Sequence, residues 1–151
     1  NIMGFINYLY IIDNSICVYP DYKHNFINVS SGEVIRKLES EFNQLFIEHG
    51  ENKRIILLLD LTKIDINNLG IGIPTLKILI QYLQTNYPEK LNSVIIYNYS
   101  EKIKFIIALL KSFVNPEVSA KIIVDRNYQK FIDILLNRKK IKNPNNTELH
   151  C

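Results

Sequence analysis

Three short, mainly apolar runs recur along this chain, and segments with helical periodicity separate them. The runs are Arg54–Leu61, Ser93–Asn98 and Ala120–Val124. Strands that are covered on both faces have this composition, and short strands that alternate with helices form parallel sheets. The pattern therefore predicts an α/β domain whose sheet is largely parallel.

The segments around these runs complete the predicted order of elements. Phe5–Ile12 and Ser15–Tyr19 are rich in β-branched and aromatic residues and predict a hairpin across Asp13-Asn14. Ser30, with Glu33 three residues later, is typical of a capping box and begins a helix that His49-Gly50 ends. The spacing of apolar residues predicts further helices over Pro74–Tyr87, Ser100–Phe113 and Tyr128–Leu136, with a loop over Thr62–Gly72.

Length and composition exclude several classes of protein. A chain of 151 residues fits one domain, which we assign to residues 1–136, with a polar, basic tail over 137–151. A net charge of +3 does not suggest a nucleic-acid-binding surface. Two cysteines favour a reducing compartment, and the apolar runs are shorter than the roughly 20 residues of a membrane span. We expect a cytoplasmic protein.

The sequence offers little support for catalysis. Gly70-Ile71-Gly72-Ile73-Pro74 lacks the third Gly or the Lys of a phosphate-binding loop, so we interpret it as an ordinary loop. Asp60 and Asp65 stand where α/β enzymes hold ligands, but caps of turns are the favoured interpretation. His24, His49 and His150 have no partner at metal-ligand spacing. We predict neither an enzyme nor a metal site.

The segment Ser100–Phe113 is more apolar than a core helix requires. Ile103, Ile106, Ile107 and Leu110 form one stripe, which Phe105, Leu109 and Phe113 widen. At 100° per residue the apolar arc covers about 200°, against about 100° for a helix with one buried face. Two interpretations stay open, namely a helix that faces lipid and a helix wedged between neighbours or against a partner. The helix alone favours the second.

Several motifs in order resemble the CRAL-TRIO lipid-binding domain, in particular its phosphatidylinositol-transfer members. They are Leu59-Asp60-Leu61, Tyr87-Pro88-Glu89-Lys90-Leu91, Val94-Ile95-Ile96-Tyr97-Asn98, Phe113-Val114-Asn115-Pro116 and Lys121-Ile122. The resemblance covers about Arg54 to Leu136. It implies a mixed sheet with helices on one side, and a hydrophobic lipid cavity on the other side that a mobile gate helix closes.

The resemblance also implies a set of lipid-binding residues. The headgroup contacts of the family fall on Glu89, Lys121 and the basic residue Lys90. The gate helix falls on Ser100–Phe113, so its seven apolar residues are the expected lipid-facing or interface set. An ammonium can pair with a phosphodiester, and a carboxylate can accept hydrogen bonds from inositol hydroxyls. The resemblance implies a non-enzymatic domain that binds or transfers a phospholipid, with phosphatidylinositol as one candidate, and that touches membranes transiently.

Departures from the family pattern leave an alternative open. We expect a compact variant without the family's N-terminal helical lobe and C-terminal Leu-Pro…Gly-Gly segment, which resembles BCH-type domains. Such a domain would act as a scaffold for a small GTPase or as a homodimer. A sulfate-transporter/anti-sigma-antagonist-like domain ranks third, because the loop over 65–70 has no Ser to phosphorylate. Arg138, Lys139, Lys140 and Lys142 could attract anionic lipid, but we favour a solvated terminus.

Overall fold

The computed structural model describes residues 6–20, 31–63 and 69–134. It begins with the predicted hairpin, in which β1 (Ile6–Ile12) pairs antiparallel with β2 (Ser15–Pro20). Asp13, in the turn, has a φ of 52°, a left-handed conformation that Asp tolerates better than most residues. The tail predicted over 137–151 lies outside the described residues.

The first helix matches its sequence prediction within a residue at each end. It is α1 (Ser31–His49), and its stripe of Val34, Leu38, Phe42 and Phe46 is buried. Gly50 ends it at a φ of 110°, and the Gly50 N–H donates to the carbonyl of Phe46 at 2.8 Å. Because only glycine adopts this conformation without strain, the predicted stop is a true C-terminal cap.

The second helix begins earlier than predicted. After β3 (Arg54–Asp60) and the short 3₁₀ turn η2 (Leu61–Lys63), α2 runs over Leu69–Asn86. The loop expected to reach Gly72, and with it the Gly-rich stretch, is therefore partly helical. Gly and Pro are weak helix formers, so local propensity predicted a loop here, but tertiary context routinely overrides propensity.

The segment after β4 (Leu91–Tyr97) also differs from its prediction. Instead of one long helix, a 3₁₀ turn, η4 (Glu101–Ile103), leads into the short helix α3 (Phe105–Lys111). An unpredicted helical turn, α4 (Pro116–Ser119), follows, and the side chain of Asn115 caps it by accepting from the Val118 N–H at 2.8 Å. Pro116 occupies the first helical position, where its missing N–H costs nothing.

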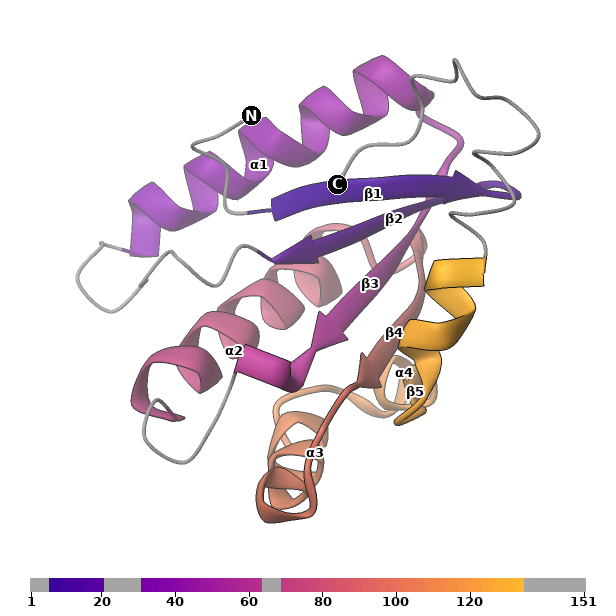
Figure 1. Ribbon diagram of the computed structural model, residues 1–151. Coiled ribbons are helices and arrows are strands. Elements are labelled where there is room, and N and C mark those ends of the chain that lie inside the picture. Colours follow the sequence, from indigo (N-terminus) through magenta and orange to yellow (C-terminus); the bar gives the residue numbers. More distant parts are fainter. Residues whose placement is uncertain (1–5, 21–30, 64–68, 135–151) are drawn as a thin grey trace.

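The chain then completes the sheet and crosses to its other side. The last strand is β5 (Ile122–Val124), and a helix follows whose described part covers residues 128–134. The strand order is β1-β2-β3-β4-β5, with β2 to β5 mutually parallel. The predicted mixed, largely parallel sheet is confirmed (Figure 1).

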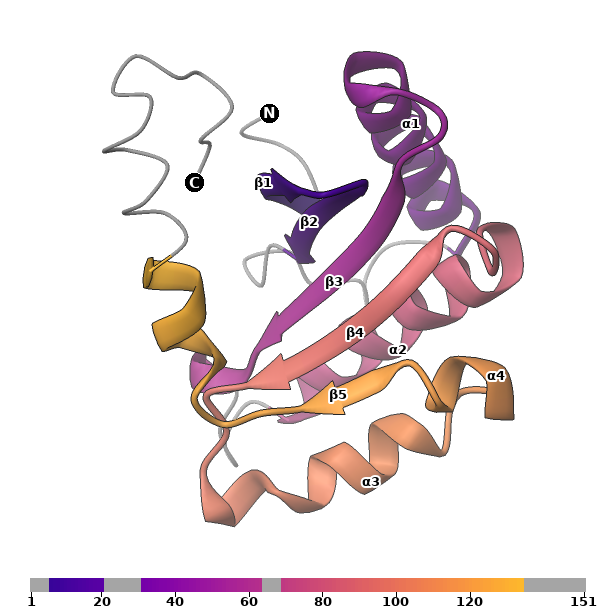
Figure 2. The same cartoon turned by 90° about the vertical axis from the view of Figure 1, so that its right-hand side faces the viewer.

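The helices α1, α2 and α3 share one face of the sheet, which we call the first face. Each crossover steps to the next strand in the same direction, so right-handed connections place these helices on the same side. Their apolar residues form one cluster with alternate strand residues such as Ile16, Leu57 and Ile96. The helix over 128–134 packs on the opposite, second face, as Figure 2 shows.

Candidate functional site

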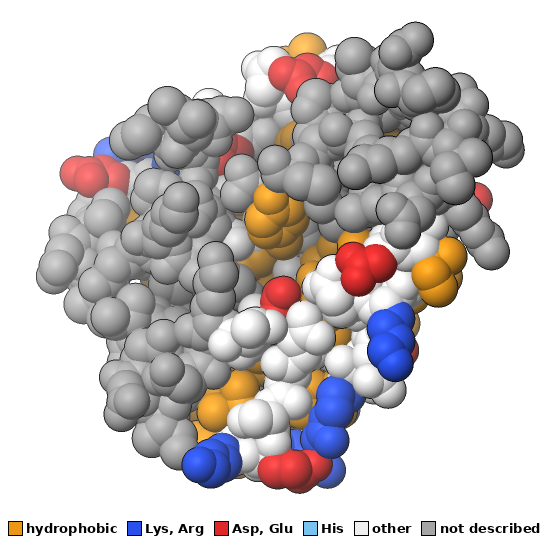
Figure 3. Space-filling view, in the orientation of Figure 1, with side chains coloured by type: hydrophobic (Ala, Val, Ile, Leu, Met, Phe, Trp, Pro, Cys, Tyr) orange, Lys and Arg blue, Asp and Glu red, His pale blue; other side chains and the backbone are white. Residues whose placement is uncertain are grey.

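The second face of the sheet is apolar and aromatic. β2, β3 and β4 direct alternate side chains to this second face. They are Cys17, Tyr19, Ile56, Leu58, Ile95 and Tyr97. Because side chains alternate between the two faces of a strand, one sheet can build two separate apolar layers. Ile132 and Tyr128 of the helix over 128–134 pack onto this layer. Figure 3 views the molecule in the orientation of Figure 1, and hydrophobic side chains are visible in the middle of this view.

A cluster of aromatic rings, two of them phenols, lies at the carboxyl end of this layer. The ring of Tyr97, which is 5% exposed, lies 5.7 Å from that of Tyr128, and Tyr128 lies 5.2 Å from Phe131. Burial, and then the nearby charge of Asp60, raise the pKa of Tyr97. The phenol therefore stays neutral and presents a polar atom within an otherwise apolar wall.

Asp60 has a structural role in this conformation. Its Oδ1 accepts hydrogen bonds from the Thr62 N–H at 2.9 Å and from the Thr62 hydroxyl at 2.6 Å. These bonds cap the turn after β3, which is the interpretation that the sequence favoured for Asp60. Its expected partner Asp65 lies outside the described residues.

Lys121 and Glu89, two of the predicted headgroup residues, lie together at the amino ends of β5 and β4, opposite the end that carries Tyr97 and Asp60. The Lys121 ammonium donates to the carbonyl of Pro88 at 2.9 Å and lies 4.0 Å from the carboxylate of Glu117. Glu89 is exposed and follows Pro88 in the turn before β4. The structure thus brings Lys121 to the turn that carries Glu89, although 32 positions separate them in the sequence. Their contact with a lipid headgroup stays a prediction.

The third predicted headgroup residue, Lys90, reaches toward α1. Its ammonium donates to the carbonyl of Glu51 and lies 4.4 Å from the centre of the Phe46 ring. A cation over an aromatic face is an attractive contact even at an exposed site. Lys90 therefore joins the end of α1 to the turn before β4, and its ammonium has different neighbours from that of Lys121.

The apolar residues of α3 and its flanks divide between the core and the surface. Four of the seven predicted lipid-facing or interface residues are at most 8% exposed and belong to the first-face core: Ile103, Ile106, Ile107 and Leu110. Phe105 and Leu109 are 55% and 38% exposed, and Phe113 lies half-buried with the Lys77 ammonium 4.9 Å from its ring centre. The resemblance implied that this helix would close the face of the sheet opposite α1 and α2. In the structure α3 lies on the first face instead, because the β4–α3–β5 crossover places it there.

Exposed cations surround the two apolar residues of α3. Lys102 lies on η4, Lys111 ends α3, and Lys104 lies between these elements. All three are exposed, and each is within three positions of Phe105 or Leu109 in the sequence. We call these five residues the α3 patch. An apolar centre with basic neighbours suits the interface of a membrane with anionic lipids.

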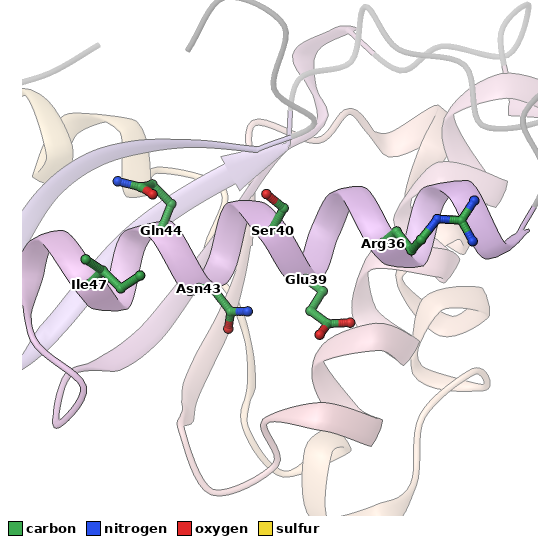
Figure 4. A pocket seen from close by; sticks show the side chains of 6 residues that line it. All are labelled: Arg36, Glu39, Ser40, Asn43, Gln44 and Ile47. Carbon is green, nitrogen blue, oxygen red and sulfur yellow. The ribbon is translucent and has the colours of Figure 1, made fainter.

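A hollow that sequence reasoning did not predict lies along the outer side of α1. It has a volume of about 460 Å³, and Figure 4 shows the lining side chains, which are Arg36, Glu39, Ser40, Asn43, Gln44 and Ile47. Five of the six are polar and, with the exposed Ile47, they form the outward stripe that any solvated helix presents, so their spacing carried no sign of a hollow. In the described ranges, no group of three or more His, Cys, Asp or Glu residues could hold a metal ion. No described helix is long and apolar enough to cross a membrane.

Comparisons with known proteins agree with this architecture. The family model of the CRAL/TRIO domain matches residues 13–139, so this chain belongs to that family. Among solved structures, the crystal structure of Sfh5 matches with a TM-score of 0.60 and 16% sequence identity, over 80% of this chain and 48% of that one. The match spans about half the length of Sfh5. The comparison with curated proteins found no match.

Proposed function

We propose that this chain is a non-enzymatic lipid-binding domain that holds a phospholipid and exchanges it with membranes. The observation that carries the proposal is the second apolar layer of the sheet, which α1, α2 and α3 do not use. Apolar walls stabilise an acyl chain by about 0.8 kcal/mol per buried CH₂ group, so a sheet face and its covering helix could hold one. Membership of the CRAL/TRIO family supports this interpretation.

The finer part of the proposal concerns the headgroup. Lys121 offers an ammonium, 20% exposed in its side chain, at the turn that carries the exposed Glu89. In the proposal, Lys121 leaves its carbonyl partner for a phosphodiester, because an ammonium is attracted more strongly to a negatively charged oxygen than to a neutral carbonyl. Glu89 would accept hydrogen bonds from headgroup hydroxyls, which favours an inositol lipid.

The α3 patch is the proposed membrane contact. Each Lys near an anionic surface contributes about 1 kcal/mol, and Phe105 and Leu109 would enter the interface between headgroups and acyl chains. This contact is electrostatic in part, so it weakens at high salt. We place the activity at the cytoplasmic surface of a membrane.

A transfer assay between liposomes tests the proposal. Labelled phosphatidylinositol should move to acceptor vesicles that contain anionic lipid, and native mass spectrometry of protein purified from cells should show a bound phospholipid. Phe105→Asp should slow transfer about tenfold or more, because it places a charge where apolar area is buried. Ile35→Asp is the matched control, since Ile35 is similarly exposed, at 47%, but lies on α1.

Headgroup recognition is tested separately from membrane contact. Lys121→Ala should reduce transfer of phosphatidylinositol, whereas Lys37→Ala on α1 should not. If the purified protein is bare polypeptide and no labelled lipid moves, the lipid-binding function is wrong. If both lysine variants behave alike, the headgroup assignment is wrong and the apolar site can still stand.

The tight first-face core favours a second candidate, a protein-interaction module on the same fold. Ile106 and Leu110 are fully buried, so the space beneath α3 is occupied by its own side chains in this conformation. The exposed Phe105 would then contact a protein, such as a small GTPase or a second copy. Sizing in solution and pull-down of small GTPases distinguish this module from lipid transfer, and a dimer that Phe105→Asp abolishes would support it.

A further inference from the structure

Two neighbouring connections at the carboxyl end of the sheet lead to opposite faces. Residues 98–100 join β4 to η4 and α3, on the first face, and residues 125–127 join β5 to the helix over 128–134, on the second face. Because β4 and β5 are adjacent and parallel, both connections leave the sheet side by side (Figure 2). A contact between them can therefore join the coverings of the two faces.

Side chains and backbone join these connections at four points. The Arg126 guanidinium donates to the carboxylate of Glu101 and lies 4.8 Å from the ring centre of Tyr99. The Asn98 N–H donates to the carbonyl of Arg126 at 3.4 Å, and the Asn98 side-chain amide donates to that of Gln129 at 3.3 Å. We call these five residues the Arg126 latch.

The contacts of the latch are weak enough to be broken by thermal motion or by a ligand. The side chains of Arg126 and Glu101 are 45% and 69% exposed, and exposed ion pairs are individually weak. Arg126 lowers the pKa of Glu101, mainly through the hydrogen bond and then through its charge. Three of the four contacts involve Arg126 and the fourth involves Asn98, whose N–H bonds Arg126, so movement of Arg126 weakens the whole link.

We propose that the Arg126 latch couples α3 to the helix over 128–134, so that loosening either covering of the sheet loosens the other. The consequence for ligand exchange rests on the proposed function. A phospholipid that enters against the second face must displace the helix over 128–134, and the latch transmits this displacement to α3 and its membrane-facing patch. Entry of lipid and movement of the α3 patch are then one event.

Hydrogen exchange of the lipid-free chain, followed by mass spectrometry, measures this coupling. In Arg126→Gln and in Glu101→Gln, amides of residues 105–111 and of residues 128–134 should both exchange about two to five times faster, the range that loss of an exposed ion pair supports. Lys130→Gln is the matched control, because it removes one exposed charge from the helix over 128–134, four positions after Arg126. Its exchange should equal that of the unaltered chain.

A charge reversal separates the specific pair from a general effect of charge. Glu101→Arg and Arg126→Glu should each accelerate both segments, and the double variant should restore slow exchange. The proposal is overturned if either glutamine variant changes exchange only in its own segment, or if the double variant is additive. Since the experiment contains no lipid, its outcome is independent of the transfer assay, so failure of the latch and failure of lipid binding are distinguishable.

Discussion

Asn98 determines the path of the chain from β4 toward α3. Its φ of 56° lies in the left-handed region, which costs most residues free energy but which Asn and Gly adopt readily. This conformation turns the chain at the end of the strand, where the Asn98 side chain also bonds Gln129. One residue thus combines a turn with a contact between the two connections.

The backbone conformation of Asn98 can be tested with two substitutions. Both Asn98→Gly and Asn98→Val remove the amide bond to Gln129, so their difference isolates the cost of the left-handed conformation. We expect Asn98→Val to be less stable than Asn98→Gly by about 1–2 kcal/mol in the free energy of unfolding. Urea denaturation gives this difference. Equal stability of the two variants would contradict the turn.

At the scale of elements, α3 is short and has two unlike sides. Leu110 is fully buried against the first-face core, whereas Leu109, the adjacent residue, is 38% exposed. A 200° apolar arc is therefore resolved into a buried side and a smaller exposed patch. The arc is as broad as the sequence indicates, but its breadth alone does not show which of its residues are buried in the core.

These two neighbouring leucines provide a matched pair for the docking of α3. Leu110→Ala should lower the free energy of unfolding by about 2–5 kcal/mol, because it leaves a cavity in the core. Leu109→Ala should change it by about 0.5 kcal/mol, as is typical of surface substitutions. Urea denaturation measures both, with far-UV circular dichroism as a check of folding. Similar losses in the two variants would show that α3 packs differently.

At the scale of the whole molecule, each face of the sheet holds a tyrosine whose ionisation folding suppresses. Burial, as the largest cause, raises the pKa of Tyr97 on the second face and of Tyr82 in the first-face core. A phenol with a raised folded-state pKa contributes stability that is fully present below its unfolded pKa of about 10. The contribution is lost as the pH rises above that value toward the folded-state pKa.

Alkaline unfolding should therefore depend on these phenols. We expect the urea midpoint of the unaltered chain to fall as the pH rises above about 10. In Tyr97→Phe the fall should be shallower, because one of the two suppressed ionisations is gone. Midpoints measured at intervals from about pH 8 to pH 11 give the slope. A slope equal to that of the unaltered chain would mean that Tyr97 is not buried as described.

Secondary structure followed from the sequence where local rules were strong. The three apolar runs predicted β3, β4 and β5, and Gly50 predicted the end of α1, because strand patterning and the conformational freedom of glycine are local properties. The start of α2 at Leu69 was not predictable, since Gly70, Gly72 and Pro74 argue against a helix and only packing overrides them.

The candidate site divides in the same way. Motif resemblance predicted Glu89 and Lys121 as headgroup residues, a role that stays a prediction. The parallel sheet places them at one end, because the amino ends of neighbouring strands coincide. The divergent contacts of Lys90 and the pairing of Glu101 with Arg126 left no trace in the sequence. Contacts between residues 25 or more positions apart depend on how strands order themselves, and no local pattern encodes that order.

The sequence by itself determined the strands, the approximate places of the main helices, and that the chain is a layered α/β domain, because periodicity and capping act over a few residues. Only the tertiary structure decided that α3 shares the first face with α1 and α2, and that the helix over 128–134 covers the second. The physical reason is the handedness of the crossovers. A right-twisted sheet accepts each crossover in one hand, so the order of the strands decides on which face α1, α2 and α3 lie. The helix over 128–134 follows the last described strand, and burial of Ile132 against the second apolar layer places it there.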